Sequence, residues 1–114
     1  ARVVHVHCKD VRRDVLDRAI RQDMGFLDAI VGGVFTVPGD GCIAFTPLLR
    51  TLHEADYAGW LVVEAEQDPR KAHPLTYARL GYHNLLAAAK EAGFDLPCHC
   101  EERSDEAIST GTAQ

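Results

Sequence analysis

The sequence has no apolar run long enough to cross a membrane, and no basic segment followed by an apolar one at its start. The first absence excludes a spanning helix, which needs about 20 apolar residues, and the second leaves no visible secretory signal. Basic residues are also few, with 12 Lys and Arg against 17 Asp and Glu. Such an acidic balance gives no electrostatic reason to bind nucleic acid or an anionic membrane. We therefore expect a cytoplasmic protein that binds neither.

The cysteine pattern favours free thiols. The four cysteines are Cys8, Cys42, Cys98 and Cys100, and nothing else in the sequence indicates secretion. A structural zinc site typically needs two Cys-x2-Cys pairs, and Cys98-His99-Cys100 has no second half elsewhere. The 114 residues, 46% hydrophobic and 25% charged, have the composition of at most one ordinary globular domain.

Hydrophobic periodicity predicts strands that alternate with helices. The expected elements are a strand over 2–7, a helix over 11–22, a short helical piece over 26–31, a turn-rich loop over 36–41, a helix over 46–56, a strand over 60–66 and a helix over 75–92. Thr46 and Pro47 predict a helix start, with Thr46 as N-cap. Gly93 is the expected C-cap of the last helix.

This alternation is typical of parallel βα units and predicts an α/β fold with right-handed crossovers. Two strands alone do not form a stable parallel sheet, and a complete TIM barrel needs about 250 residues. The simplest interpretation is the last quarter of such a barrel, although periodicity alone leaves other doubly wound folds open. Because the chain begins with Ala1 and enters a strand at once, we expect its true start to lie upstream.

Histidines and glutamates follow the two predicted strands. His5 and His7 share one face of the first strand, and Glu64 and Glu66 end the second. Polar side chains at the carboxyl ends of parallel strands mark the active-site face of such folds. Imidazole and carboxylate together suit a divalent Mn, Co, Fe or Zn ion. The residues alone leave open whether they bind a metal or are hydrogen-bonded and solvated surface groups.

Charged residues directly after the first strand are further candidates. Lys9 or Arg12 could hold a hydroxylated substrate or stabilise developing negative charge. In the alternative interpretation, Asp10 caps the following helix and the arginine is solvated. The 36–41 loop is either a substrate-facing lid or a plain connection. Trp60 and the tyrosines are expected to be packing groups.

Three blocks carry a resemblance to a known family. They are His-Val-His-Cys-Lys-Asp-Val-Arg at 5–12, Gly-Val-Phe-Thr-Val-Pro-Gly-Asp-Gly at 33–41 and Gly-Trp-Leu-Val-Val-Glu-Ala-Glu-Gln-Asp-Pro at 59–69. Together they resemble the C-terminal part of the inosose dehydratases, in the xylose-isomerase-like TIM-barrel superfamily. The resemblance implies that residues 1–94 form strands 7 and 8 of the barrel with their helices. We expect residues 95–114 to be a disordered tail, because they carry almost no apolar pattern. Their resemblance to peptides read from repetitive intergenic bacterial DNA implies read-through past the natural end of the protein.

The resemblance also implies a metal site. The superfamily holds one divalent ion with two Glu, one Asp and one His. His7 matches the histidine ligand and Glu64 one glutamate, so the other ligands would come from upstream strands. Manganese or cobalt is the implied ion, and glutathione a further implied cofactor. With half of the ligand set, the chain by itself is expected to be inactive.

The reaction implied by the resemblance is loss of water from 2-keto-myo-inositol, so the full-length protein would be a hydro-lyase. We also expect the full-length protein to form a homo-oligomer. Enediolate formation would precede elimination of the β-hydroxyl, with Glu64 and Lys9 in catalytic roles. His5, Arg12 and Glu66 would contact the polyol ketone. Two alternatives stay open: a sugar epimerase or isomerase of the same superfamily, and an inactive truncated fragment.

Overall fold

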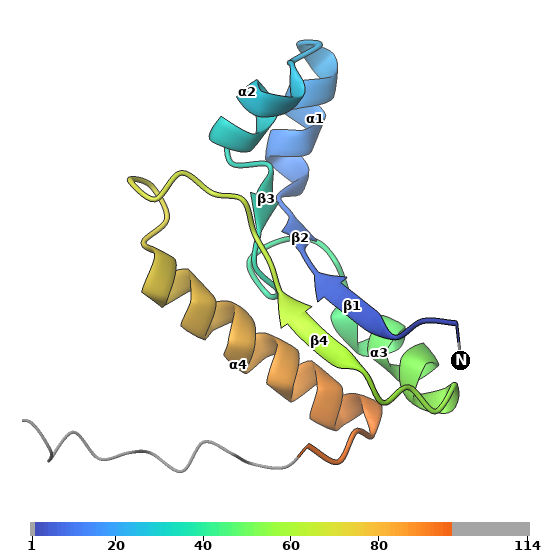
Figure 1. Ribbon diagram of the computed structural model, residues 1–114. Coiled ribbons are helices and arrows are strands. Elements are labelled where there is room, and N and C mark those ends of the chain that lie inside the picture. The colour runs from blue at the N-terminus through green and yellow to red at the C-terminus, as the bar shows by residue number, and fades with distance from the viewer. Residues whose placement is uncertain (1, 97–114) are drawn as a thin grey trace, which may run out of the picture.

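The structure is a computed structural model that describes residues 2–96. Strands and helices alternate along the chain (Figure 1). The elements are β1 (His5–Cys8), β2 (Asp10–Val11), α1 (Arg13–Arg21), α2 (Phe26–Val31), β3 (Phe35–Thr36), α3 (Phe45–Glu54), β4 (Trp60–Val63) and α4 (Pro74–Ala92). The predicted α/β class is therefore confirmed. The expectation of a disordered tail concerns residues that, from 97 onward, lie outside the described residues.

The two longer strands form a parallel sheet. β1 lies beside β4, with His5 opposite Trp60 and His7 opposite Val62. Alternate side chains of both strands point toward α3 and α4, and form the main core with them. The residues of this core include Val6, Cys8, Leu49, Leu61, Val63, Leu85 and Ala89. Both strands thus have one face packed on helices.

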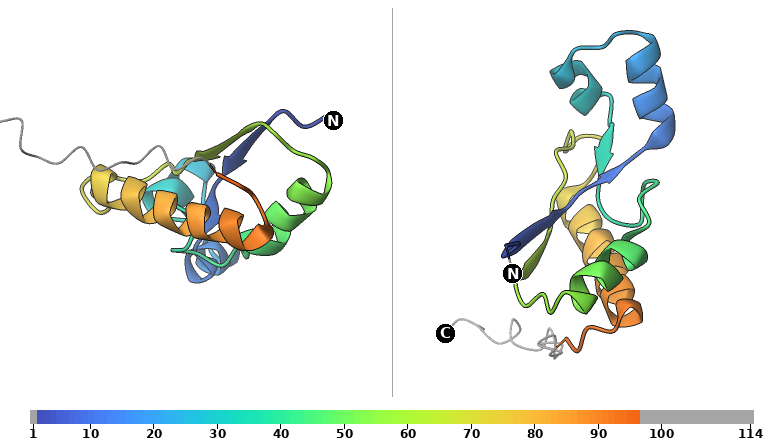
Figure 2. Two further views of the ribbon diagram at one scale, coloured as in Figure 1. Left: turned by 90° about the horizontal axis from the view of Figure 1, so that it is seen from below. Right: turned by 90° about the vertical axis from the view of Figure 1, so that its right-hand side faces the viewer.

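The opposite face of this sheet is uncovered by the described residues. Figure 2 shows α3 and α4 together on one side of β1 and β4. Trp60 lies on the other side and is 76% exposed, so the expectation that it is a packing group is not met in this chain. An apolar run such as that of β4 is typical of a parallel strand covered on both faces, but no described element lies over the second face.

Helix α4 has the ends that its sequence predicts. Pro74 stands in its first turn, where a missing backbone N–H costs nothing. Gly93 ends it in the left-handed conformation, with φ of 105°, so the predicted C-cap is confirmed. In its middle, Gly81 permits a close approach, because a Cβ there would lie 2.7 Å from both Val37 and Val63.

The predicted start of α3 is wrong. The helix begins at Phe45 with Ala44 as N-cap, and no side chain caps it. Thr46 lies within the first turn instead, where its hydroxyl bonds the Glu91 carboxylate of α4 at 3.2 Å. The Thr46 hydroxyl, which the sequence pattern predicts as a helix cap, thus forms a hydrogen bond between α3 and α4 instead.

A short antiparallel ribbon, which the sequence did not predict, joins the sheet to α1 and α2. β2 pairs with β3, with Asp10 opposite Thr36 and Val11 opposite Phe35. Beyond it, α1 and α2 pack around a second small core and project away from the sheet (Figure 1). Two-residue strands are too short to produce a periodic signal.

Among the described residues, no helix combines the length and apolarity that crossing a bilayer requires.

Candidate active site

His7 and Glu64 meet on the uncovered face of the sheet, at the carboxyl ends of β1 and β4. The Glu64 N–H donates to the carbonyl of Cys8 at 3.2 Å, which extends the strand pairing one residue past β4. This pairing brings the Glu64 side chain over β1, where its Oε2 hydrogen-bonds Nδ1 of His7. The structure thus brings together the two side chains that the resemblance assigns to one metal ion.

Lys9 joins this pair from the residue after β1. Its Nζ lies 2.9 Å from Oε1 of Glu64 and 2.5 Å from Oε2 of Glu66. Hydrogen bonds to Glu66 and then Glu64 raise the pKa of Lys9. In return, the Lys9 hydrogen bond, followed by that of His7, lowers the pKa of Glu64. The raised pKa of Lys9 and the lowered pKa of Glu64 both favour the ion pair between this ammonium and this carboxylate.

His5 lies beside this cluster on the same uncovered face. Its ring centroid is 5.0 Å from that of His7, and the two planes are tilted by 56°. The expectation that both histidines share one face of the strand is thus met. Together, His5, His7, Lys9, Glu64 and Glu66 form what we call the strand-end cluster.

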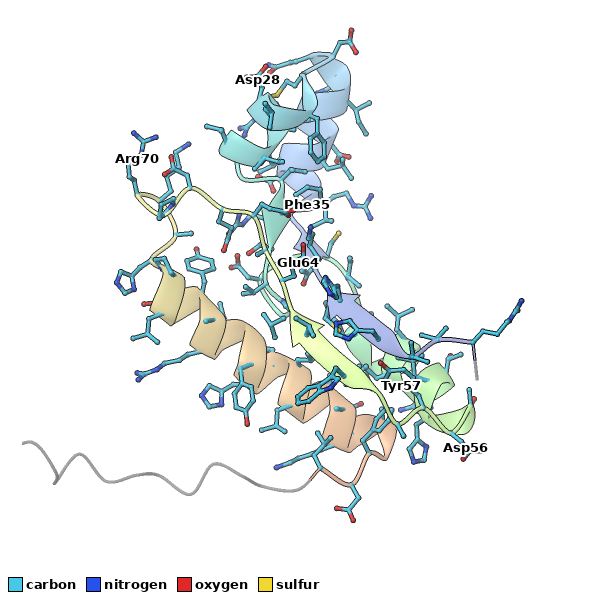
Figure 3. All side chains as sticks on the ribbon, viewed as in Figure 1. Asp28, Phe35, Asp56, Tyr57, Glu64 and Arg70 are labelled. Carbon is cyan, nitrogen blue, oxygen red and sulfur yellow. The ribbon has the colours of Figure 1, made fainter. Side chains whose placement is uncertain are left out.

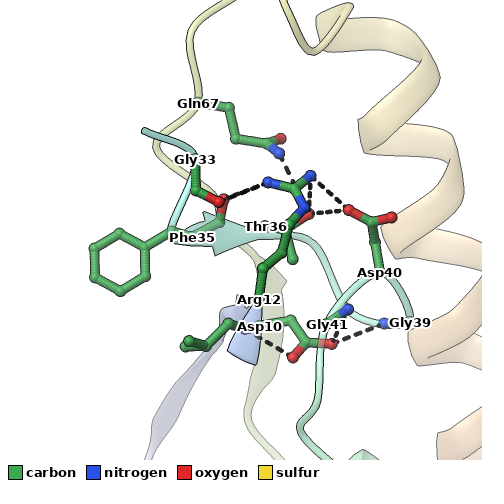
Figure 4. Close-up of polar contacts among 10 residues, drawn as sticks. Asp10, Arg12, Gly33, Phe35, Thr36, Gly39, Asp40, Gly41 and Gln67 are labelled. Atoms are coloured by element: carbon green, nitrogen blue, oxygen red, sulfur yellow. Dashed lines mark hydrogen bonds and ion pairs between the residues drawn. The ribbon is translucent and has the colours of Figure 1, made fainter. Parts of the chain in front are cut away.

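Arg12 belongs to a separate polar network, from which the Phe35 ring points away (Figure 4). Its guanidinium donates to the carbonyl of Gly33 at 2.8 Å, to the hydroxyl of Thr36 at 3.0 Å and to the carboxylate of Asp40 at 2.6 Å. A cavity of about 270 Å³ adjoins it, and Tyr77 of α4 forms part of the cavity wall. In this structure, Arg12 therefore holds the 33–40 segment in place.

Asp10 fastens the same segment from its other end. Its side chain is fully buried, and its carboxylate accepts backbone N–H groups of Val11, Gly39, Gly41 and Ile43 at 2.8–3.1 Å. The interpretation of Asp10 as a helix cap is wrong, because α1 has Arg12 at its N-cap position and no side-chain cap. A buried carboxylate needs this many donors, and the glycine-rich loop provides them.

Sequence reasoning missed this role of Asp10 and the position of Phe35. The ring of Phe35 lies 4.9 Å from Nζ of Lys9 and faces away from the Arg12 network (Figure 4). For Asp10, the available sequence signal was an Asp together with a loop that contains two glycines, Gly39 and Gly41, whose backbone N–H groups can bind a carboxylate. In contrast, the contact of the half-buried Phe35 ring with Lys9 has no sequence signature, because it depends on the β2–β3 ribbon.

The strand-end cluster fits half of a divalent metal site. An imidazole nitrogen and a carboxylate oxygen are donors that Mn and Co accept. Among residues 2–96, no three His, Cys, Asp or Glu side chains are grouped closely enough to hold an ion. Further ligands would have to come from outside the described part of the chain.

Comparison with known protein families identifies the family of the chain. A family model described as "Xylose isomerase-like TIM barrel" matches residues 1–79. The chain belongs to the xylose isomerase-like TIM barrel family. This membership confirms the superfamily that the three sequence blocks indicated.

Three individual relatives, two of them inosose dehydratases, match most of the chain. The chain is 59% identical over 95 residues to the rhizopine catabolism protein MocC of Rhizobium meliloti, which covers 83% of the chain and 29% of that protein. It is 52% identical over 96 residues to an inosose dehydratase of Geobacillus kaustophilus, covering 78% of the chain and 31% of the relative. An inosose dehydratase of Halalkalibacterium halodurans is 58% identical over 77 residues, with 68% and 25% covered. The chain therefore spans less than a third of the length of these relatives.

Proposed function

We propose that the chain forms the C-terminal two βα units of a TIM barrel that dehydrates 2-keto-myo-inositol, with β1 as the seventh strand and β4 as the eighth. The observation that carries this proposal is the meeting of His7 and Glu64 at the ends of adjacent parallel strands. It occurs in a chain that is 52% identical to one inosose dehydratase over 96 residues and 58% identical to another over 77 residues.

The uncovered sheet face supports the barrel assignment. Side chains on this face, such as the 76% exposed Trp60, would point into the barrel interior, which in a complete barrel is filled by layers of side chains. The helices on the opposite face would belong to the outer ring (Figure 2). The missing strands would then cover the apolar surface that this chain leaves open.

His7 and Glu64 would hold the divalent ion, Mn or Co. When bound, such an ion acts as a Lewis acid that polarises the substrate carbonyl. The lowered pKa of Glu64 favours its ionised form and makes it a weaker base. These properties suit a metal ligand that orients the substrate more than they suit the group that removes the proton. We therefore place the principal base outside this chain.

Lys9 and its neighbours would act on the substrate directly. In the elimination, a base would take the proton from the carbon next to the ketone, and the electron pair left there would form the C=C bond. The β-carbon–oxygen bond would break, and the hydroxyl would leave as water after it takes up a proton from an acid. The Lys9 ammonium, 2.9 Å from Oε1 of Glu64, would stabilise negative charge on the ketone oxygen as the C–H bond breaks. His5 and Glu66 would bind hydroxyls of the polyol, and Arg12 would support the pocket by holding the 33–40 segment.

The test is a hybrid barrel, in which the full chain replaces the matching segment of the Geobacillus kaustophilus inosose dehydratase. With added Mn or Co, we expect it to convert 2-keto-myo-inositol to the dione, followed by NMR of the product. Parallel reactions with reduced glutathione test the second implied cofactor. A folded hybrid that yields an epimer would favour a ketose epimerase instead, and one that yields no product would contradict the proposal.

A further inference from the structure

Three groups among the described residues lie close to the Lys9 ammonium, and Figure 3 labels two of the residues that carry them, Glu64 and Phe35. Two are the carboxylates of Glu64 and Glu66, at 2.9 and 2.5 Å. The third is the ring of Phe35, whose centroid lies 4.9 Å from Nζ. An ammonium over an aromatic face is attracted by the negative charge of the π system. The side chain of Lys9 is 25% exposed, so this attraction acts in partly desolvated surroundings.

The backbone fixes where this ring lies. Phe35 is paired with Val11 in the β2–β3 ribbon, and Val11 follows Lys9 by two residues along the chain. Neighbouring side chains of a strand point to opposite faces, so Thr36 faces the Arg12 network while Phe35 faces Lys9 (Figure 4). The hydrogen bonds on the Thr36 side thus set the position of the ring on the other side.

A second aromatic contact supports the ring from α2. The rings of Phe26 and Phe35 meet edge to face, with centroids 6.2 Å apart and planes at 63°. This arrangement is one of the favourable geometries of aromatic pairs. Phe26 is otherwise 69% exposed, and its contact with Phe35 links α2 to the strand-end cluster.

We propose that Phe35 is a positioning residue that holds the Lys9 ammonium against Glu64. Without the ring, only the ion pair with Glu64, among the described contacts of Lys9, opposes movement of the ammonium toward Glu66. The inference rests on the proposed function for its kinetic consequence, but the contact itself is independent of the reaction. Phe26 contributes by supporting the ring.

The direct test is NMR spectroscopy of the full chain and of the hybrid barrel, with lysine labelled at the ε carbon. We expect nuclear Overhauser contacts between the Lys9 ε protons and the Phe35 ring, and an upfield ring-current shift of those protons. Phe35→Leu should remove the shift, and Phe35→Tyr should retain it. Absence of the contact in the hybrid barrel with the natural Phe35 would overturn the proposal, whether or not any variant folds.

The kinetic test uses the same variants in the hybrid barrel. If Lys9 acts on charge that develops only in the transition state, Phe35→Leu should lower kcat a few-fold to about tenfold, with KM nearly unchanged. Phe35→Tyr should restore most of this loss. Phe94→Leu is the matched control, because Phe94 is also half-buried in an aromatic contact but lies past the far end of α4.

The outcomes separate the two proposals. Equal losses of kcat in Phe35→Leu and Phe35→Tyr would show a purely structural role and overturn the positioning proposal. A hybrid barrel that shows the Lys9–Phe35 contact but no dehydration would contradict the proposed function alone.

Discussion

Gly41 lies directly against the buried carboxylate of Asp10. Its N–H donates to Oδ2 at 3.1 Å, and a Cβ at this position would lie 2.3 Å from Oδ1. The loop can approach the carboxylate this closely only because residue 41 has no side chain. Asp10 and Gly41 are therefore one structural unit, although they are separated in sequence by α1 and α2.

We predict that Gly41→Ala destabilises the protein by about 1–3 kcal/mol, the usual range when an atom is forced into a closely packed site. The loop amides would have to withdraw from Asp10, which would leave a buried carboxylate short of donors. Urea unfolding of the hybrid barrel measures the change. Gly25→Ala is the control, because the nearest atom to its added Cβ is a flexible Asp28 oxygen at 3.2 Å. Equal stability of the two variants would contradict this account.

We predict that His7→Ala and Glu64→Gln each lower the activity of the hybrid barrel by about 100-fold or more, the order typical for loss of one essential electrostatic group. Circular dichroism should remain unchanged, since both side chains lie on the uncovered face and contribute little to the core. His83→Ala, at an exposed position of α4, should keep full activity. Near-normal activity of either site variant would remove that residue from the site.

We predict a pH effect at Asp68, whose carboxylate accepts hydrogen bonds from the Arg70 side chain at 2.9 and 3.0 Å. The Arg70 side chain, and next its backbone N–H, lower the pKa of Asp68 below the ordinary 3.8. Because the folded-state pKa is lowered, the stabilisation is present above pH 3.8 and is lost as the pH falls through the folded value.

The measurement is NMR titration of the Asp68 carboxyl carbon. Arg70→Gln should raise the pKa of Asp68 toward the ordinary value, whereas Arg50→Gln, on α3, should leave it unchanged. An unaltered Asp68 titration in Arg70→Gln would show that the backbone N–H alone maintains the shift. Arg70 is 84% exposed, so added salt should weaken the effect.

We predict that Trp60, the single tryptophan, reports whether the sheet face becomes covered. In the chain alone its indole is 76% exposed, so its emission should be that of a hydrated indole and readily quenched by iodide. In the hybrid barrel the added strands should bury it, shift the emission to shorter wavelength and protect it. The signal is the difference between each protein and its Trp60→Phe variant. Identical quenching in both would argue against the barrel assignment.

The sequence predicted the features that depend on local pattern. Helix α4 and its Gly93 cap follow from a long apolar stripe and a glycine, and the shared face of His5 and His7 follows from strand alternation. The meeting of His7 with Glu64 required one further step, the parallel order of β1 and β4. Each of these depends on one period or one topological rule.

The features that sequence reasoning missed depend on contacts between distant segments. Thr46 has the pattern of a cap, yet its hydroxyl bonds Glu91 on another helix. Asp10 precedes a helix, yet its carboxylate binds a loop some 30 residues later. In both cases a short polar side chain has a local and a distant partner available, and only the packed structure decides between them.

The parallel pairing of β1 with β4 also has a consequence for the order of folding. His7 and Glu64 are 57 residues apart, whereas α3, β4 and α4 follow one another along the chain. Closing the longer loop costs more chain entropy, so the α3–β4–α4 unit should assemble before β1 docks on it. During synthesis, β1 leaves the ribosome well ahead of its partner. Until β4 emerges, the backbone edge of β1 stays open to other chains, and His7 is made 57 residues before its partner Glu64.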